Sequence, residues 1–311
     1  MTSNEAPTRR SCAAQDIHQQ LLADSPGYRA ARIELEGLTQ ELQTSDAVTR
    51  REVARIAVVV HVVWNTEEQN ISDAQIASQI DVLNQDFRAT NADLDIVPSV
   101  FGRLISDAKI EFYLATTDPD GNPTTGVTRR STLLRGFAAD DNVKRDSDGG
   151  VDPWPTDRYL NIWVCPLVGG LLGYAQFPGG AADTDGVVVT TTAFGTIGTA
   201  TAPFNLGRTA THEVGHYLNL FHIWGDEDGN QNPCSLSDLV DDTPNQADPN
   251  GGIPTFPHIS CNNGPDGDLF YDYMDYTDDA GMVMFTHGQA ARMSACLEST
   301  RKSLWAAEVR H

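Results

Sequence analysis

Continuous and alternating runs of apolar residues predict an α/β domain in the middle of the chain. Residues 56–64 are almost continuously apolar and rich in valine, which is typical of a central strand covered on both faces. His61 interrupts this run and is expected to be a hydrogen-bonded core or edge histidine. Residues 109–114 alternate between apolar and polar, as in a half-buried strand. Two further strands are expected, at residues 159–164 and 186–190.

Apolar residues at helical spacing predict helices between and after these strands. The first begins after Ser72, and its apolar face is Ile76, Ile80, Leu83 and Phe87. The second spans residues 208–218. The last begins after Thr286, which can form a capping box with Gln289, and its apolar face is Ala290, Met293, Leu297 and Leu304. Residues 169–180 are rich in glycine but lack the Lys-Ser/Thr of a phosphate-binding loop, so a plain loop is expected there.

The chain divides at two changes in composition. Residues 1–51 are polar, show helical periodicity between positions 13 and 42, and end in the dibasic sequence Thr49-Arg50-Arg51. We expect a detachable N-terminal segment that is cut near this site, and an extension that stays attached is the alternative. Residues 52–219 carry the predicted strands and the first helices. After them Asp, Asn, Gly and Pro predominate, so residues 220–311 are expected to form a second, less regular subdomain.

The charge balance argues against two classes of partner. The 311 residues include 43 Asp and Glu against 21 Lys and Arg, and the formal net charge is −22. Such a surface repels nucleic acid and anionic membranes. Many carboxylates lie between positions 226 and 279, where a hard cation such as calcium is a natural partner and a solvated acidic surface is the alternative. The longest apolar run is about half as long as a membrane-spanning helix, so no membrane partner is expected.

One stretch, HEVGHYLNLFH, brings together three histidines and a glutamate. His212 and His216 are four residues apart, so on a helix they lie on one face and can reach one cation. The chain must then turn back to add His222 as a third ligand. Asn219 suits this turn, because asparagine is the commonest substitute for glycine at positive φ. Three protein ligands leave the fourth position of zinc open, and Glu213 beside them is placed to act on water as a general base.

An odd number of cysteines leaves one over if the others pair, and they stand at positions 12, 165, 234, 261 and 296. Cys234 and Cys261 flank a loop rich in Pro, Gly, Asn and Asp, which is the kind of segment that a disulfide stabilises in an oxidising compartment. We expect this pair to be bonded. Cys165 and Cys296 lie in apolar patterns and are expected to be buried thiols. Cys12 stands apart from the others.

The histidine stretch resembles the long zinc motif of the metzincin metalloproteases, with Asn219 in place of a glycine. Residues 271–276, YDYMDY, resemble the Met-turn of that clan in the form that the pappalysin family has. Similarity to the ulilysin-like bacterial branch of this family extends to VDDTP at residues 240–244 and FTHGQ at residues 285–289. The resemblance runs from about residue 56 to residue 293 and is strongest in the C-terminal half.

This resemblance implies a fold and several residue roles. The fold is the two-subdomain catalytic domain of metzincins: a mixed, twisted β-sheet with a backing helix and an active-site helix, then an irregular C-terminal subdomain with a Met-turn and a terminal helix. Met274 would form an apolar floor beneath the zinc. Tyr276 would contact the metal or the oxyanion of the transition state. A calcium site of the family type is expected around Asp238, Asp241 and Thr243.

Latency and substrate preference are also implied by the resemblance. RSCA at residues 10–13 is similar to the cysteine switch of the family, with Ala13 where glycine is frequent. Cys12 would then bind zinc in the latent form, and the N-terminal segment would inhibit its own catalytic domain. Ulilysin-like relatives favour Lys or Arg on the leaving side of the bond, which requires a carboxylate here between positions 238 and 279. Ala280-Gly281 replaces a further cysteine that many relatives have, so no second disulfide is expected there.

These observations predict a secreted, monomeric zinc endopeptidase that acts on protein or peptide substrates. Glu213 would take a proton from water and return it to the leaving amine, while Tyr276 would stabilise the oxyanion. The first twenty residues lack the apolar core of a secretory signal, so either the signal is absent from this sequence or export uses another route. Two alternatives are a non-catalytic, calcium-stabilised binding module with a structural zinc, and a zinc hydrolase that acts on a non-peptide bond.

Overall fold

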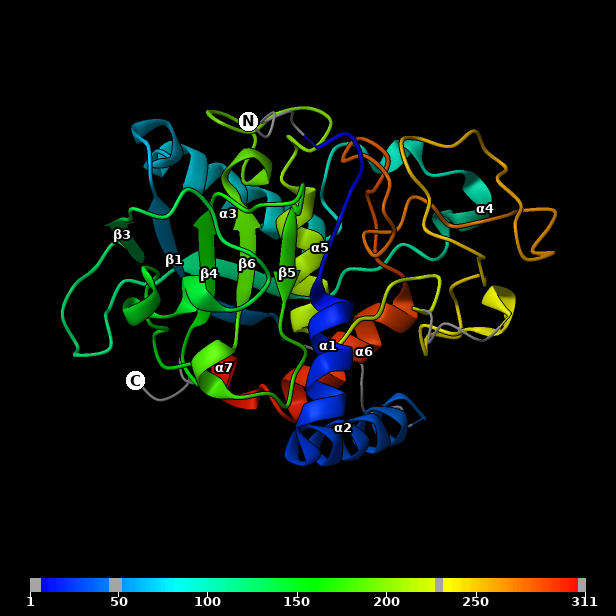
Figure 1. The fold of residues 1–311 in the computed structure, drawn as a ribbon. Coiled ribbons are helices and arrows are strands. Elements are labelled where there is room, and N and C mark those ends of the chain that lie inside the picture. Colours follow the sequence, from blue (N-terminus) through cyan, green and yellow to red (C-terminus); the bar gives the residue numbers. More distant parts are fainter. Residues whose placement is uncertain (1–6, 45–51, 227–231, 307–311) are drawn as a thin grey trace.

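The computed structural model describes residues 7–44, 52–226 and 232–306, and at its centre is a six-stranded mixed sheet (Figure 1). The strand order is β2-β1-β4-β6-β5, and β3 pairs with the second half of β1. All pairs are parallel except β5 with β6. The strands are Ala54–Trp64 (β1), Ile110–Leu114 (β2), Val127–Ser131 (β3), Leu160–Cys165 (β4), Gly173–Ala175 (β5) and Val187–Thr190 (β6). The prediction of a mixed sheet with residues 56–64 in a central strand is confirmed.

Two strands have no recognisable signal in the sequence. β3 reads Val-Thr-Arg-Arg-Ser and does not alternate between apolar and polar residues. β5 lies inside the glycine-rich stretch 169–180, for which the pattern predicts a plain loop. This prediction is wrong, because β5 pairs with β6 from Gly173 opposite Val189 to Ala175 opposite Val187. Pairing with a neighbouring strand, and not local propensity, makes both segments extended.

Helices α3 (Asp73–Phe87) and α5 (Arg208–Tyr217) contribute to the main core on one face of the sheet (Figure 1). This core contains Val58 and Ile162 from the sheet, Leu83 from α3 and Val214 from α5. The Ser72 hydroxyl accepts a hydrogen bond from the backbone N–H of Gln75 at 3.1 Å, so the predicted N-cap of α3 is confirmed. A further short helix, α4, covers Ser99–Gly102.

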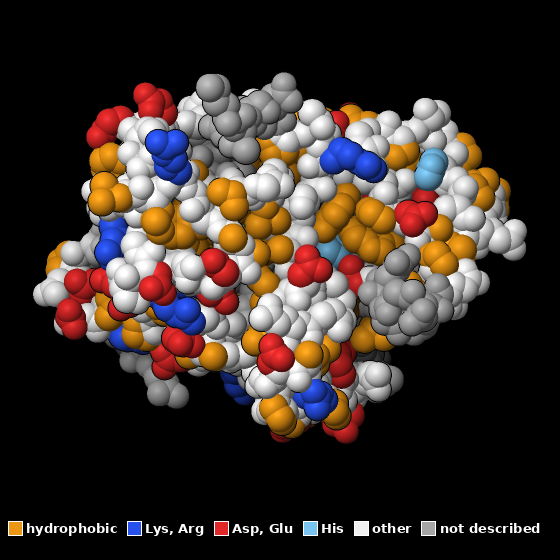
Figure 2. All heavy atoms as spheres, viewed as in Figure 1, with side chains coloured by type: hydrophobic (Ala, Val, Ile, Leu, Met, Phe, Trp, Pro, Cys, Tyr) orange, Lys and Arg blue, Asp and Glu red, His pale blue; other side chains and the backbone are white. Residues whose placement is uncertain are grey.

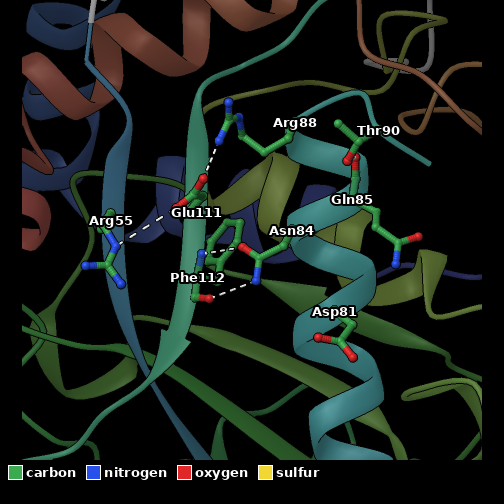
Figure 3. Close-up of a pocket in the computed structure, with 8 residues that line it drawn as sticks. All are labelled: Arg55, Asp81, Asn84, Gln85, Arg88, Thr90, Glu111 and Phe112. Carbon is green, nitrogen blue, oxygen red and sulfur yellow. Dashed lines mark hydrogen bonds and ion pairs between the residues drawn. The ribbon is translucent and has the colours of Figure 1, made fainter.

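Strand β2 lies at an edge of the sheet, and a side chain of α3 satisfies part of its outward-facing backbone (Figure 3). The side-chain oxygen of Asn84 accepts from the N–H of Phe112 at 2.7 Å, and its amide donates to the carbonyl of Phe112 at 3.0 Å. Beside this pair, Glu111 forms ion pairs with Arg88 and Arg55 at the rim of a surface pocket. Asn84 therefore occupies the backbone groups of Phe112 that another strand would need for pairing.

The buried residues His61, Cys165 and Cys296 behave as predicted. His61 is fully buried, with Nδ1 2.7 Å from the Thr128 hydroxyl and Nε2 2.9 Å from the Asn161 side-chain oxygen. Cys165 and Cys296 are buried free thiols, and burial raises the pKa of both. Hydrogen bonds and packing account for these groups, so none of them is a candidate ligand.

The C-terminal helix differs from its prediction in one respect. Thr286 and Gln289 form the expected capping box at the start of α6 (His287–Glu298). The helix ends there, and Leu304 lies on a separate helix, α7 (Lys302–Ala306). The prediction of one continuous helix is wrong, because the chain between them turns Arg301 inward, where it donates to the carbonyl of Tyr217 at 2.8 Å.

Between Leu218 and Phe285 the described residues form no regular strand and only one turn of 3-10 helix. The predicted disulfide between Cys234 and Cys261 is confirmed and closes a separation of 27 residues. The buried Asp275 accepts from the backbone N–H and the side-chain amide of Asn250, each at 2.8 Å. A covalent link and buried carboxylates therefore order a segment that lacks hydrophobic periodicity.

The described part of the N-terminal segment forms two helices, α1 (Ala14–Asp24) and α2 (Pro26–Thr44), below the sheet in Figure 1. The helical periodicity predicted between positions 13 and 42 is confirmed, with a break at Ser25 because a proline follows it. Residues 7–13 run as an extended strip across the molecule before α1. The predicted cleavage site at residues 49–51 lies outside the described residues.

In Figure 2, Lys and Arg side chains stand singly on the visible face, while acidic side chains are more widely spread. This face therefore has no basic patch among the described residues. No described helix is both long enough and apolar enough to cross a lipid bilayer.

Candidate metal centre

Three imidazoles converge where α5 ends. His212 and His216 lie on α5, and the chain then reverses at Asn219, whose φ of 77° confirms the predicted positive φ. This turn brings His222 back to the helix. The Nε2 atom of His216 lies 3.2 Å from that of His212 and 3.1 Å from that of His222. Zinc held by imidazole nitrogens at about 2.0–2.1 Å in a tetrahedral arrangement would separate them by about 3.3 Å, so this donor set fits one zinc ion.

Each imidazole is oriented by a hydrogen bond at its other nitrogen. Nδ1 of His212 lies 2.7 Å from the carbonyl of Tyr273, and Nδ1 of His216 lies 2.8 Å from the carbonyl of Leu220. Nδ1 of His222 contacts a carboxylate oxygen of Asp226 at 2.5 Å. Donation through Nδ1–H leaves the lone pair of each Nε2 free for a metal. Burial, reinforced by the neighbouring imidazoles, lowers the pKa of the two α5 histidines well below the ordinary value, so both are neutral ligands.

Glu213 faces the same space from the next position on α5. Its carboxylate is buried 3.3 Å from the Cys12 sulfur, and burial raises the pKa of Glu213 to about 8. A cation at the imidazoles would oppose this shift, because it favours the charged carboxylate. Gly173 on β5 makes room for the side chain, since a Cβ atom there would lie 2.8 Å from the Glu213 carboxylate.

Met274 lies directly beneath α5. It is fully buried, and a Cβ atom on Gly215 would lie only 2.4 Å from its sulfur, so the glycine inside the histidine motif is required by this contact. The carbonyl of Met274 accepts a hydrogen bond from the N–H of Ile223 at 3.2 Å. Because Ile223 follows His222, this bond connects the turn that contains Met274 to the third histidine. The predicted position of Met274 as a floor agrees with this packing.

Tyr276 is next to the third histidine. The ring centroids of Tyr276 and His222 are 4.9 Å apart, and Trp224 packs at 4.7 Å on the same tyrosine. The Tyr276 hydroxyl lies 3.3 Å from both the N–H and the carbonyl of Cys12. The N-terminal segment thus covers the hydroxyl in this state.

Cys12 completes the cluster from the far end of the sequence. Its sulfur and the three imidazoles have ligand atoms that all lie within 4.8 Å of one another. The flanking backbone pairs with β5, because Leu172 donates to the carbonyl of Ser11 at 3.0 Å and Ala13 donates to that of Gly173 at 3.2 Å. Burial, and then the charge of Glu213, raises the pKa of the thiol. A metal ion at this point would oppose that effect by stabilising the thiolate.

Arg10 fills a pocket beside the centre. Its guanidinium pairs with a buried carboxylate oxygen of Asp279 at 2.6 Å and donates to the Thr209 hydroxyl at 2.9 Å and to the Thr277 carbonyl at 3.2 Å. The side chain also lies over the Phe204 ring, 5.1 Å from its centroid. This pocket can bind a basic side chain through an ion pair, hydrogen bonds and a cation–π contact.

The residues predicted to bind calcium are only partly together. Asp238 is buried, and both of its carboxylate oxygens lie 2.9 Å from the Thr243 hydroxyl. Asp241 is exposed, so the expected trio does not converge in this state. The neighbouring Asp242 has another role: it accepts from the Thr286 hydroxyl at 2.7 Å and from the N–H of Gly288 at 2.9 Å at the start of α6.

Sequence reasoning did not identify Gly173, Trp224, Asp226 or Asp279 as individual members of the site. The sequence places Asp226 in an acidic loop and Asp279 only within a range of candidate carboxylates. Asp226 follows His222 by four residues, and a carboxylate is a common hydrogen-bond partner of a metal-binding histidine. This spacing is the one sequence signal that could have identified Asp226. Nothing in the sequence indicates that β5 and α5 meet at Gly173.

The fold and the centre together define a zinc metalloendopeptidase of the metzincin class. The sequence model of the family described as "Pregnancy-associated plasma protein-A" (Peptidase_M43) matches residues 142–298. An extracellular metalloprotease of Pyricularia oryzae is 31% identical over 94% of this chain and 90% of its own length. The chain belongs to the pappalysin family, Peptidase_M43. This membership decides against a non-catalytic module and against a hydrolase of non-peptide bonds.

Solved structures agree with this assignment. A mutant of promirolysin from Tannerella forsythia is 45% identical and has a TM-score of 0.88, covering 96% of this chain and 99% of that chain. Mature mirolysin of the same organism, in complex with a cleaved peptide, is 50% identical with a TM-score of 0.80 and covers 84% of this chain and 100% of that chain. The predicted metzincin fold is confirmed.

Proposed function

We propose that this chain is a secreted zymogen of a zinc endopeptidase in which the N-terminal segment blocks the metal centre. The observation that carries the proposal is the cluster of His212, His216, His222 and Cys12, with ligand atoms within 4.8 Å of one another beside Glu213. Hydrolysis of casein by the chain after its N-terminal segment is cut away, with zinc content measured, tests it. Secretion is supported by relatives named extracellular metalloproteases.

In the active form the three histidines would hold zinc, which supplies Lewis acidity toward water and the peptide carbonyl. Glu213 would take the proton of the attacking water and return it to the leaving amine. Tyr276 would donate its hydroxyl hydrogen bond to the developing oxyanion once Cys12 has left. Both groups face the same space as the imidazoles, as the contacts of Glu213 and Tyr276 with Cys12 indicate.

Latency would come from Cys12 acting as the fourth zinc ligand, because a thiolate occupies the position that water needs. The comparison with mirolysin supports this role of the N-terminal segment. The promirolysin structure covers 96% of this chain, whereas the mature form covers 84%. We expect the cut to fall near Arg50 and Arg51.

A preference for Lys or Arg on the leaving side of the bond would be set by Asp279. Arg10 occupies its pocket in the latent chain and would be replaced by the basic side chain of a substrate. The short ion pair, the Thr209 hydroxyl and the Phe204 ring support this assignment. The second carboxylate oxygen of Asp279 accepts from the N–H of Leu206 at 2.7 Å, which fixes the carboxylate in place.

Asp279→Asn should reduce kcat/KM for substrates with Arg or Lys on the leaving side by about 100-fold, because removal of one member of a buried charge pair costs about 2–5 kcal/mol. The asparagine oxygen can still accept from Leu206, and its amide then faces the substrate cation. Substrates with leucine at that position should be cleaved at an unchanged rate. Asp278→Asn is the matched control, since Asp278 is near enough to feel the charge of Arg10 but forms no ion pair with it among the described contacts. Equal losses for both substrate types would refute the assignment.

Acid should weaken docking of the N-terminal segment through His18. Burial, helped by Arg32 and opposed by Asp226, lowers the pKa of His18 from 6.5 to about 4. The undocked state therefore binds more protons between these values, so the stabilisation is complete above about pH 6.5 and is lost as the pH falls toward about 4. The midpoint of urea unfolding should fall between pH 7 and pH 5, and this fall should be smaller for His18→Gln than for the parent chain. Both chains carry Glu213→Ala. Parallel pH profiles would contradict this prediction.

Calcium would bind at Asp238 and Thr243, with Asp241 joining only after a local movement. Burial raises the pKa of Asp238 to about 7, which indicates a carboxylate that lacks a full counter-charge. A calcium-selective chelator should therefore lower the melting temperature of the zinc-loaded chain, and calcium but not zinc should restore it. An unchanged melting temperature would remove calcium from the proposal and leave the zinc centre unaffected.

A further inference from the structure

The N-terminal segment has a second contact region outside the metal centre, built around one carboxylate on α2. The Oε1 atom of Glu36 accepts from Nη2 of Arg292 at 2.5 Å and from Nη2 of Arg32 at 2.9 Å. The side-chain amide of Asn219 donates to the same oxygen at 3.4 Å. Two of these three donors belong to the catalytic domain, so Glu36 joins the segment to it by charge-assisted hydrogen bonds.

Arg292 is held in place by the catalytic domain itself. Its side chain is 1% exposed, and Nε donates to the carbonyl of Asn219 at 2.6 Å. Its guanidinium also lies over the Phe221 ring, 5.2 Å from the centroid. These contacts involve only α6 and the turn between the second and third histidines, so they do not require the N-terminal segment. Arg292 is thus preorganised to receive a carboxylate.

An apolar contact extends this region toward α1. Phe177 and Phe221 stack with ring centroids 5.1 Å apart, and His18 of α1 packs on Phe177 at 4.8 Å. Arg32 of α2 lies over both phenylalanines, at 5.3 and 5.7 Å. Tyr28 is buried in the same cluster as Phe177, and two partly buried leucines of the segment pack against that cluster. Aromatic side chains next to a buried arginine are typical of the residues that dominate binding energy in protein interfaces.

We propose that Phe177, Asn219, Phe221 and Arg292 form a docking surface for α1 and α2 that binds independently of Cys12 and retains the segment after it has been cut. The proposal rests on the proposed function and adds a mode of regulation to it. Cutting within residues 45–51 removes the covalent tether but none of these contacts. Binding then becomes intermolecular, so the cut segment remains an inhibitor at high enzyme concentration and leaves on dilution.

This surface also gives a reason for the asparagine in the histidine motif. A glycine at position 219 would adopt the φ of 77° with less strain, but it has no side chain to donate. Asn219 provides both the turn and a donor to Glu36. The departure from the usual motif is therefore part of the docking surface.

The test uses the full zinc-loaded chain with Glu213→Gln to prevent self-digestion, Cys12→Ser to remove the thiol, and a recognition sequence for a site-specific protease between positions 45 and 51. After cutting, size-exclusion chromatography at a series of dilutions gives the Kd of the two fragments. Glu36→Gln is the test variant. Glu34→Gln is the matched control, because it lies on the same helix with an exposed side chain.

We expect the cut Cys12→Ser fragments to stay together at micromolar concentration and Glu36→Gln to raise the Kd by about tenfold or more over Glu34→Gln. Complete separation of the Cys12→Ser fragments at micromolar concentration would overturn the proposal, as would equal Kd values for the two variants. Because the readout is fragment association, absence of casein hydrolysis by the activated parent chain would refute the proposed function and leave this result standing.

Discussion

Glu213→Ala should lower kcat/KM for peptide hydrolysis by on the order of 10³-fold once the N-terminal segment is removed, because the reaction would lose its proposed general base. The fold and zinc content should not change. The Nε2 atoms that would hold the metal belong to His212, His216 and His222, and each imidazole is oriented by an oxygen that does not come from Glu213. Metal content by mass spectrometry and kcat/KM on a fluorogenic peptide, measured on the same samples, check this expectation.

Glu213→Gln is the matched variant, since it keeps the shape of the side chain beside Gly173 but cannot take up a proton at neutral pH. It should lose activity to a similar extent. Activity that survives in a zinc-replete sample of either variant would require another base and would refute the mechanism. Loss of zinc from Glu213→Gln would instead assign the carboxylate to the metal site.

Removal of residues 1–51 should raise the activity of the parent chain by about 100-fold or more. Cys12 lies at the imidazoles and Arg10 lies in the Asp279 pocket, so the metal centre and the pocket proposed to set specificity are both occupied in the intact chain. If the N-terminal segment is displaced in about 1% of intact molecules, its complete removal raises the rate of hydrolysis by about 100-fold. Activity before and after cleavage in residues 45–51, with zinc measured on both, checks this expectation.

The cut Glu213→Ala chain is the control, because it separates activation from any contaminating protease. The assay must be run at high dilution, since the released segment is expected to rebind. Equal activity of intact and cut chains with equal zinc content would show that the segment does not inhibit.

The regular elements that carry the centre follow from local patterns in the sequence. β1, β4 and β6 have enough consecutive apolar residues to be recognised, and α3 and α6 have both periodicity and a capping residue. The positive φ at Asn219 follows from the spacing of the third histidine, which requires a reversal of the chain. The disulfide joins the two cysteines that flank an aperiodic loop. Apart from the disulfide, which spans 27 residues, these predictions depend on residues close together in the sequence.

The predictions that failed depend on contacts between distant residues. β5 is three residues long and becomes a strand only through β6. The turn of Arg301 toward Tyr217 separates α7 from α6, and a sequence pattern does not contain that contact. The calcium site is a different case: it follows from family resemblance alone and stays a prediction, with Asp241 exposed in this structure.

The sequence by itself determined the histidine donors, the carboxylate beside them and the class of chemistry, because the spacing of His212, Glu213 and His216 fixes their positions on one helix. Only the tertiary structure decided what surrounds that chemistry. Arg10 and Asp279 are 269 residues apart in the chain and 2.6 Å apart in space, and Glu36 meets Arg292 across 256 residues. Such pairs arise from the packing of whole elements, so no local spacing predicts which carboxylate meets Arg10 or Arg292.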